Sequence, residues 1–97
     1  MKILILTLGA NGARVITQEM DEHLPSFEVT AVDTTAAGDA FNGALAVALA
    51  EGKTLLDAVW TGMAAGALSA TKHGAQTSLP TREAVENFLE SHGYVTA

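Results

Sequence analysis

Residues 33–41, "DTTAAGDAF", place an aspartate at the start of an alanine-rich helical pattern. From Phe41 onward, Leu45 and Leu49 recur every four positions, which is the spacing of one helix face. The residues before them are small, so the backbone N–H groups of the first turn are accessible. Such N–H groups have no partner within the helix and lie at the positive end of its dipole, where anions bind. The stretch predicts an anion site beside the carboxylate of Asp39. The alternative is an ordinary helix start with a stabilising acidic residue.

The residues before this stretch predict strands. The candidate strands are Ile3–Leu8, Ala13–Gln18 and Phe27–Val32, with "MDEHLPS" (residues 20–26) as a loop or polar hairpin tip. The first candidate is apolar without alternation, which is typical of a strand covered on both faces. "GANG" (residues 9–12) ends in Asn-Gly and, taken alone, predicts a plain hairpin turn.

The residues after this stretch predict three helices. The first ends at Gly52, and the second runs from Leu55 to about Lys72. The alanines and glycines of the second helix predict a close approach to the first. The third begins after the cap Thr81, buries Val85, Phe88 and Leu89, and closes at His92-Gly93. Strands followed by helices make an α/β chain, but a strand covered on both faces needs more neighbours. The sequence therefore predicts the C-terminal third of a larger α/β domain.

Composition limits the class of protein. The chain has 97 residues, 48% of them hydrophobic and 16% charged, which indicates one small globular domain. The net charge of −6, with five Lys and Arg, gives little basis for binding nucleic acid or an anionic membrane. The absence of cysteine and of an uncharged apolar stretch of about 18 residues predicts a cytoplasmic protein. The apolar start, "MKILILTLGA", leaves a signal peptide as the alternative.

Three separated segments carry a family resemblance. "DTTAAGDAFNGAL" (residues 33–45) resembles the C-terminal signature of the ribokinase family, also called the PfkB carbohydrate kinases, with the pattern Asp/Asn-Thr-x-Gly/Ala-Ala-Gly-Asp. "TLGANG" (residues 7–12) resembles the nucleotide-binding turn of that family, and "TKHGAQTS" (residues 71–78) points to its ribokinase branch. The resemblance implies a ribokinase-like α/β fold. Residues 1–97 would form its C-terminal, nucleotide-binding and catalytic-base part, without the N-terminal sugar-binding part and the lid.

The resemblance also implies roles for individual residues. Asp39 is similar to the catalytic base that deprotonates the primary hydroxyl of the sugar, and it is the one residue of the sugar site that remains. The anion hole would be formed by Ala36, Ala37 and Gly38. ATP would be bound by Thr7, Leu8, Gly9, Ala10, Asn11, Gly12, Gly38, Asp39 and, at the adenine, Met63. A K⁺ ion would be held by Asp33, Thr35, Ala70, Lys72, Gly74 and Ser78.

The activity implied by the resemblance is ATP-dependent phosphorylation of a sugar hydroxyl, with Mg²⁺ on the phosphates and K⁺ beside the anion hole. D-Ribose is the favoured acceptor, and fructose or a nucleoside is the alternative. The partners would be a small sugar and ATP, with neither nucleic acid nor membrane. Family members often form homodimers through the lid, which is absent here. We expect the isolated chain to have little or no kinase activity. The remaining alternative is a truncated, non-catalytic remnant that binds nucleotide weakly or not at all.

Overall fold

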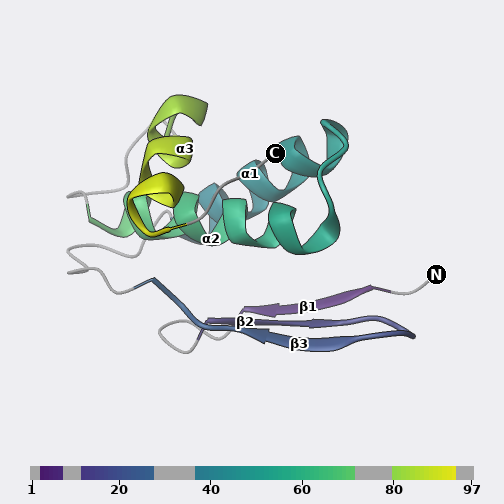
Figure 1. Cartoon of the computed structure of the whole chain (residues 1–97). Helices are drawn as coiled ribbons and strands as arrows, with labels where there is room; N and C mark the ends of the chain where they lie inside the picture. Colours follow the sequence, from purple (N-terminus) through teal and green to yellow (C-terminus); the bar gives the residue numbers. More distant parts are fainter. Residues whose placement is uncertain (1–2, 8–11, 28–36, 72–79, 94–97) are drawn as a thin grey trace.

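The computed structural model describes residues 3–7, 12–27, 37–71 and 80–93. Within these ranges three strands precede three helices, and the helices all lie on one side of the sheet (Figure 1). The strands are β1 (Leu4–Thr7), β2 (Ala13–Ile16) and β3 (Asp21–Leu24), and the helices are α1 (Ala37–Ala50), α2 (Leu55–Ala70) and α3 (Arg82–Ser91). The α/β class and the order of strands before helices are confirmed.

The sheet is antiparallel with strand order β1-β2-β3. A tight turn over residues 17–20 connects β2 to β3. In this turn the hydroxyl oxygen of Thr17 accepts hydrogen bonds from the N–H groups of Glu19 (3.2 Å) and Met20 (3.1 Å). The Thr17 N–H donates to the Met20 carbonyl oxygen at 2.8 Å. A threonine side chain of this kind replaces backbone partners and stabilises the turn.

The prediction of a loop or hairpin tip is wrong for residues 21–24. These residues were expected in a loop or hairpin tip, yet they form β3. Asp21, Glu22 and His23 are exposed at the edge of the sheet, where polar side chains do not prevent strand pairing. Phe27, the first residue of the predicted strand, lies outside the strands and packs its ring on Trp60 and Phe88, with centroids 5.6 and 4.9 Å apart. Residues 28–32 lie outside the described residues.

Within the described residues the first strand is covered on one face only, so its predicted burial on both faces, which called for a larger domain, stays a prediction. β1 is an edge strand of this sheet, and the helices cover one face only (Figure 1). Ile5 packs toward the core, whereas Leu4 and Leu6 are 51% and 39% exposed. An unbroken apolar run shows that a strand can bury side chains on both faces. Burial of the second face requires another layer of structure on that side of the sheet.

Helices α1 and α2 pack closely, as the glycines and alanines predicted. A Cβ atom on Gly62 would lie 3.0 Å from the carbonyl oxygen of Phe41, and one on Gly66 would lie 3.2 Å from that of Ala37. Both are tighter than ordinary van der Waals contact. Glycine at these two positions lets the backbone of α1 lie against α2.

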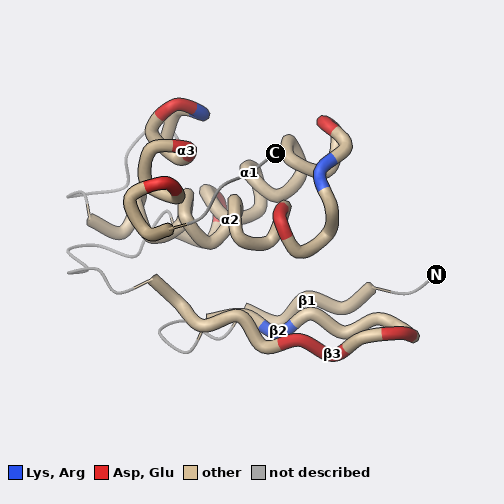
Figure 2. The backbone as a smooth tube through the Cα atoms, viewed as in Figure 1, with Lys and Arg blue, Asp and Glu red and all other residues tan. Residues whose placement is uncertain are grey.

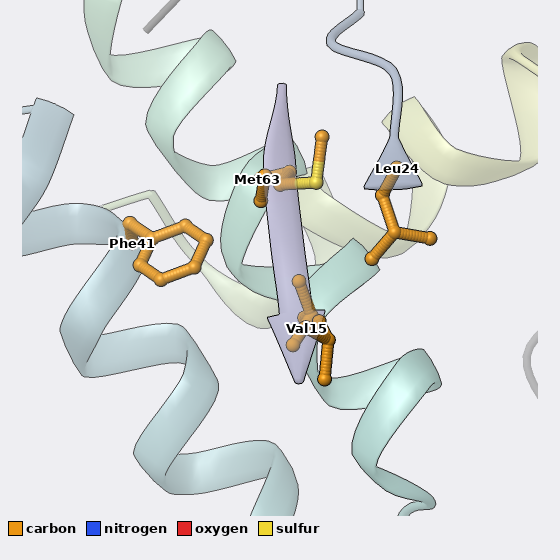
Figure 3. Packing of buried hydrophobic residues seen from close by; sticks show 6 residues of the cluster. Val15, Leu24, Phe41 and Met63 are labelled. Atoms are coloured by element: carbon orange, nitrogen blue, oxygen red, sulfur yellow. The ribbon is translucent and has the colours of Figure 1, made fainter. Parts of the chain in front are cut away.

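The core has two parts. Between the sheet and the helices, Val15 and Leu24 meet Phe41 and Met63 (Figure 3). Among the helices, alanines of α1 and α2 pack with two residues of α3, and this second cluster consists of Ala40, Ala64, Ala65, Val85 and Leu89. The inward face predicted for α1 is wrong at Leu49, which is 44% exposed, because the helix turns this position away from both clusters.

The ends of the second and third helices follow the predicted signals. α2 ends at Ala70, two residues before the predicted limit. Before α3, the hydroxyl of Thr81 accepts a hydrogen bond from the N–H of Ala84 at 3.1 Å, and the helix is followed by His92 and Gly93. None of the helices in the described part of the chain combines the length and hydrophobicity that a membrane span requires.

Candidate active site

Asp39 lies in the first turn of α1, which begins at Ala37. Gly38 and Asp39 are exposed, whereas the next two residues, Ala40 and Phe41, are buried. This pattern follows from the direction in which helical side chains point: two consecutive residues face the core, and the two before them face the surface. The first turn is therefore held by its buried side while the carboxylate of Asp39 remains accessible to solvent.

Two glycines of α2 fix the position of this turn. The carbonyl oxygens of Ala37 and Phe41 lie against Gly66 and Gly62, so the first turn of α1 rests on the backbone of α2. A side chain at either glycine would press on the turn that carries Asp39. The close contact between the two helices therefore sets where the turn that carries Asp39 lies relative to α2.

The approach to Gly38 is open. Among the described residues outside its own helical turn, a Cβ atom built on this glycine would meet no atom within 4 Å. The N–H groups of a first helical turn have no partner within the helix and attract negative charge. Accessible N–H groups of this kind can bind an oxyanion, and a surface carboxylate beside them can accept a proton from a neighbouring hydroxyl. The structure brings together Ala37, Gly38 and Asp39 of the predicted site, whereas Ala36 lies outside the described residues.

The predicted nucleotide turn is described only at its two ends. Thr7 ends β1 and pairs with Ala13, so Thr7 and Gly12 flank the turn. Gly12 is buried with a φ of 92°, and a Cβ there would lie 1.9 Å from the carbonyl oxygen of Leu24. The fold itself therefore requires glycine at this position, whether or not a nucleotide binds. Leu8, Gly9, Ala10 and Asn11 lie outside the described residues, and their contact with ATP stays a prediction.

Met63 has a place in the core. Its side chain packs with Val15, Leu24 and Phe41, and the residue is 9% exposed (Figure 3). Only this small exposed part could touch an adenine ring, and packing alone accounts for an apolar residue here. The adenine contact stays a prediction.

The predicted K⁺ site is described at a single residue. Ala70 is buried at the end of α2. The other predicted ligands lie outside the described residues: Asp33, Thr35, Lys72, Gly74 and Ser78. Where the chain is described, no group of three or more His, Cys, Asp or Glu residues could hold a metal ion. The sites of Mg²⁺ and K⁺ stay predictions.

A cavity of about 260 Å³ lies among the three helices, and the sequence did not reveal it. Ala44 and Val47 of α1, Thr61 of α2 and Val85 of α3 are among its lining residues, and Asp39 is not. At its rim Glu51 forms an ion pair with Arg82. The space exists because the small side chains between the three helices do not fill it. The alanines and glycines of α1 are the sequence feature that could have indicated this cavity.

Comparison with known protein families shows to which family the chain belongs. The model of the pfkB family of carbohydrate kinases matches residues 1–82. The chain belongs to this family. It is 46% identical over 90 residues to the ribokinase of Haemophilus influenzae, and the match covers 93% of the chain and 29% of that protein. The chain thus spans less than a third of the length of this relative.

Solved structures show the same fold. The chain is similar to the ribokinase of Thermotoga maritima, with 54% identity and a TM-score of 0.87 over 92% of the chain and 30% of that protein. A ribokinase of Arabidopsis thaliana, solved with ribose and ATP, matches at 33% identity with a TM-score of 0.84, covering 92% of the chain and 29% of that protein. The ribokinase-like fold is therefore confirmed.

A solved fructokinase of similar structure contains a potassium ion and a sugar other than ribose. A double mutant of the Vibrio cholerae enzyme, solved with fructose, ADP and a potassium ion, is 38% identical. Its TM-score is 0.80, over 90% of the chain and 30% of that protein. Family members of similar structure thus bind different sugars together with a nucleotide.

Proposed function

We propose that this chain supplies the anion hole and the catalytic base of an ATP-dependent sugar kinase, with D-ribose as the favoured acceptor. The observation that carries the proposal is the exposed first turn of α1. There Asp39 stands beside the unobstructed backbone at Gly38, on a helix held in place by α2. Membership of the pfkB family and the likeness to ribokinases support the reaction and the sugar.

In the proposed reaction, the oxygen of a primary hydroxyl of the sugar attacks the γ-phosphorus of ATP. The hydroxyl proton passes to the carboxylate of Asp39, the new O–P bond forms, and the bond between the γ-phosphorus and the bridging oxygen breaks, releasing ADP. The N–H groups of Ala36, Ala37 and Gly38 would stabilise the negative charge on the transferring group. Mg²⁺ bound to the nucleotide would offset the charge of the phosphates, and K⁺ would support the segment before the helix.

A kinase for fructose or a nucleoside is the nearest alternative, favoured by the likeness to a fructokinase. A non-catalytic remnant is the second alternative, favoured by the share of 29% of the ribokinase that the chain covers. Phosphoryl transfer requires the acceptor to be positioned and water to be excluded. We therefore expect the isolated chain to phosphorylate neither sugar.

The test joins this chain to the part of the Haemophilus influenzae ribokinase that precedes the matched segment. The fusion should phosphorylate D-ribose, and Asp39→Asn should lower its turnover by a factor of about 10²–10⁴ with little change in ATP affinity. Asp57→Asn is the matched control, because Asp57 is the acidic residue in the first turn of α2. It should leave turnover nearly unchanged.

Three results would contradict the proposal. Near-normal turnover of the Asp39→Asn fusion would remove this residue from the role of base. Activity of a fusion to the corresponding part of the Vibrio cholerae fructokinase, with none from the ribokinase fusion, would favour the fructokinase alternative. A well-folded fusion that fails with both sugars would favour the remnant.

A further inference from the structure

We propose that the cavity among α1, α2 and α3 is a second ligand site, which takes a small molecule with one aromatic ring and one carboxylate. We call it the helical cavity. Ala44 and Val47 of α1, Thr61 of α2 and Val85 of α3 are among its lining residues, and Asp39 is not. The inference is therefore independent of the proposed function, which depends on the first turn of α1.

The floor of the helical cavity is apolar. Each helix contributes a buried residue to it, Ala40 of α1, Ala65 of α2 and Leu89 of α3, none of them more than 2% exposed. The hydroxyl of Thr61 donates to the carbonyl oxygen of Asp57 at 2.8 Å, so its hydrogen is already used within α2. In the described part of the chain, no buried side-chain nitrogen or oxygen lacks a hydrogen-bond partner. The floor therefore favours an apolar group, because a polar group there would lose its hydrogen bonds to water without replacement.

The volume suits one ring with a short chain. It is about 260 Å³, whereas an apolar cavity of about 150 Å³ is sufficient for benzene. A ring is expected rather than a flexible chain, because a ring loses less conformational freedom on binding.

Contacts between the helices hold the space open. α1 and α2 already touch at Gly62 and Gly66, so they have no room to move closer. Val85 and Leu89 fix α3 in the second core cluster. The cavity is thus formed before a ligand enters, as is usual for sites that bind small molecules.

The rim of the helical cavity is charged. Its cations lie near helix ends, with Lys53 in the connection from α1 to α2 and Arg82 at the start of α3 (Figure 2). Arg82 is already paired with Glu51. Lys53 is half-buried, and its side chain forms neither an ion pair nor a hydrogen bond within the described part of the chain. A carboxylate at the rim would give this ammonium a charge-assisted hydrogen bond.

The remaining rim charge limits the class of ligand. Glu86 also lines the cavity, but it is exposed to water, so it attracts an ammonium less than the half-buried Lys53 attracts a carboxylate. Glu86 opposes a second negative charge, which disfavours phosphates and dicarboxylates. A sugar or a nucleotide needs several polar partners, which the apolar floor does not supply. A ring with a single carboxylate meets all three conditions.

The experiment titrates the isolated chain with phenylacetate, and separately with phenylacetamide and phenethylamine, which keep the ring and replace the carboxylate. Amide NMR shifts report the binding. Phenylacetate should shift the amides of lining residues on all three helices and saturate with a Kd of about 1 mM or below. The two other probes should bind more weakly by a factor of about five or more, because they lack the contact with Lys53. The fusion to the Haemophilus influenzae ribokinase part should give the same order of affinities.

Two substitutions separate the floor from the rim. Ala44→Leu fills the space and should weaken phenylacetate binding by a factor of about ten or more. Lys53→Gln should weaken it by a factor of about five and leave the binding of phenylacetamide unchanged, and Lys53→Arg should restore most of the loss. Arg14→Gln is the matched control, because it removes a positive charge from the sheet, outside the cavity. It should leave both affinities unchanged.

Several outcomes would overturn the inference. These are phenylacetamide or phenethylamine binding as tightly as phenylacetate, parental affinity in Ala44→Leu, or equal effects of Lys53→Gln and Arg14→Gln. Binding by the isolated chain that is lost in the fusion would also count against it, because the rest of the domain would then occupy the cavity. A fusion that binds phenylacetate without turnover would refute the proposed function alone, and turnover without binding would refute the ligand site alone.

Discussion

Replacing Gly12 by alanine should destabilise the chain more than the same change at Gly52. Both glycines have positive φ, 92° and 86°, which costs an alanine about 1–2 kcal/mol. A Cβ on Gly52 would meet no atom within 4 Å from the described, non-adjacent residues, whereas one on Gly12 would lie 1.9 Å from the carbonyl oxygen of Leu24. Relieving an overlap with backbone requires β3 to move, which adds about 1–3 kcal/mol. We therefore expect a loss of about 2–5 kcal/mol for Gly12→Ala and about 1–2 kcal/mol for Gly52→Ala.

The assay is urea denaturation of the whole chain, followed by circular dichroism at the helical band. With a slope of about 1 kcal/mol per M urea, the two variants should differ in midpoint by about 1–3 M. Gly38→Ala is the control without either penalty, because the position is helical and open, and it should raise the free energy of unfolding by about 0.5–1 kcal/mol. If Gly12→Ala and Gly52→Ala unfold within about 0.3 M of each other, the packing of Gly12 against β3 is wrong.

Three further predictions concern the core, a helix cap and the ion pair on the sheet. Leu89→Ala, at a position 1% exposed, should cost about 2–5 kcal/mol in urea denaturation, whereas Leu49→Ala should cost less than about 1 kcal/mol; equal losses would contradict the assigned core. Thr81→Ala should lower the free energy of unfolding by about 1 kcal/mol and Thr81→Ser should restore most of it, since the hydroxyl accepts a backbone N–H at 3.1 Å; a serine variant no better than alanine would argue against the cap. Hydrogen bonds from Arg14 hold the pKa of Asp21 below its ordinary value, so the stabilisation from this pair is present above the ordinary carboxyl pKa and is lost as the pH falls through the lowered one. An NMR titration should show the lowered pKa of Asp21 returning to its ordinary value in Arg14→Gln, and an unchanged pKa would refute the pairing.

Local signals predicted the helical half of the fold well. The start of α1 at the small residues before Asp39, the cap at Thr81 and the helix end before Gly93 each depend on a few neighbouring residues. The close approach of α1 and α2 could also be predicted, because Gly62 and Gly66 remove the side chains that would separate the helices. Family membership followed from motifs that are contiguous in the sequence.

The sheet shows what local signals could not supply. The polar residues of β3 are typical of a loop, and they form a strand because β2 offers hydrogen-bonding partners and the far side of β3 is open to water. The apolar run of β1 predicted burial on both faces, whereas Leu4 and Leu6 are exposed and the helices of the described residues cover only the other face. Met63 was expected in the core from its helical spacing, and at the adenine only from the family resemblance. Its core neighbours Val15 and Leu24 became evident only from the fold.

The sequence by itself determined the family, the three helices with their caps, and the acidic residue at the open start of α1, because each depends on residues close together along the chain. Tertiary structure alone decided the pairing of β3, the exposed edge and face of β1, and the contact that makes Gly12 indispensable. These depend on hydrogen bonds and packing between residues far apart in the sequence, so no local pattern contains them.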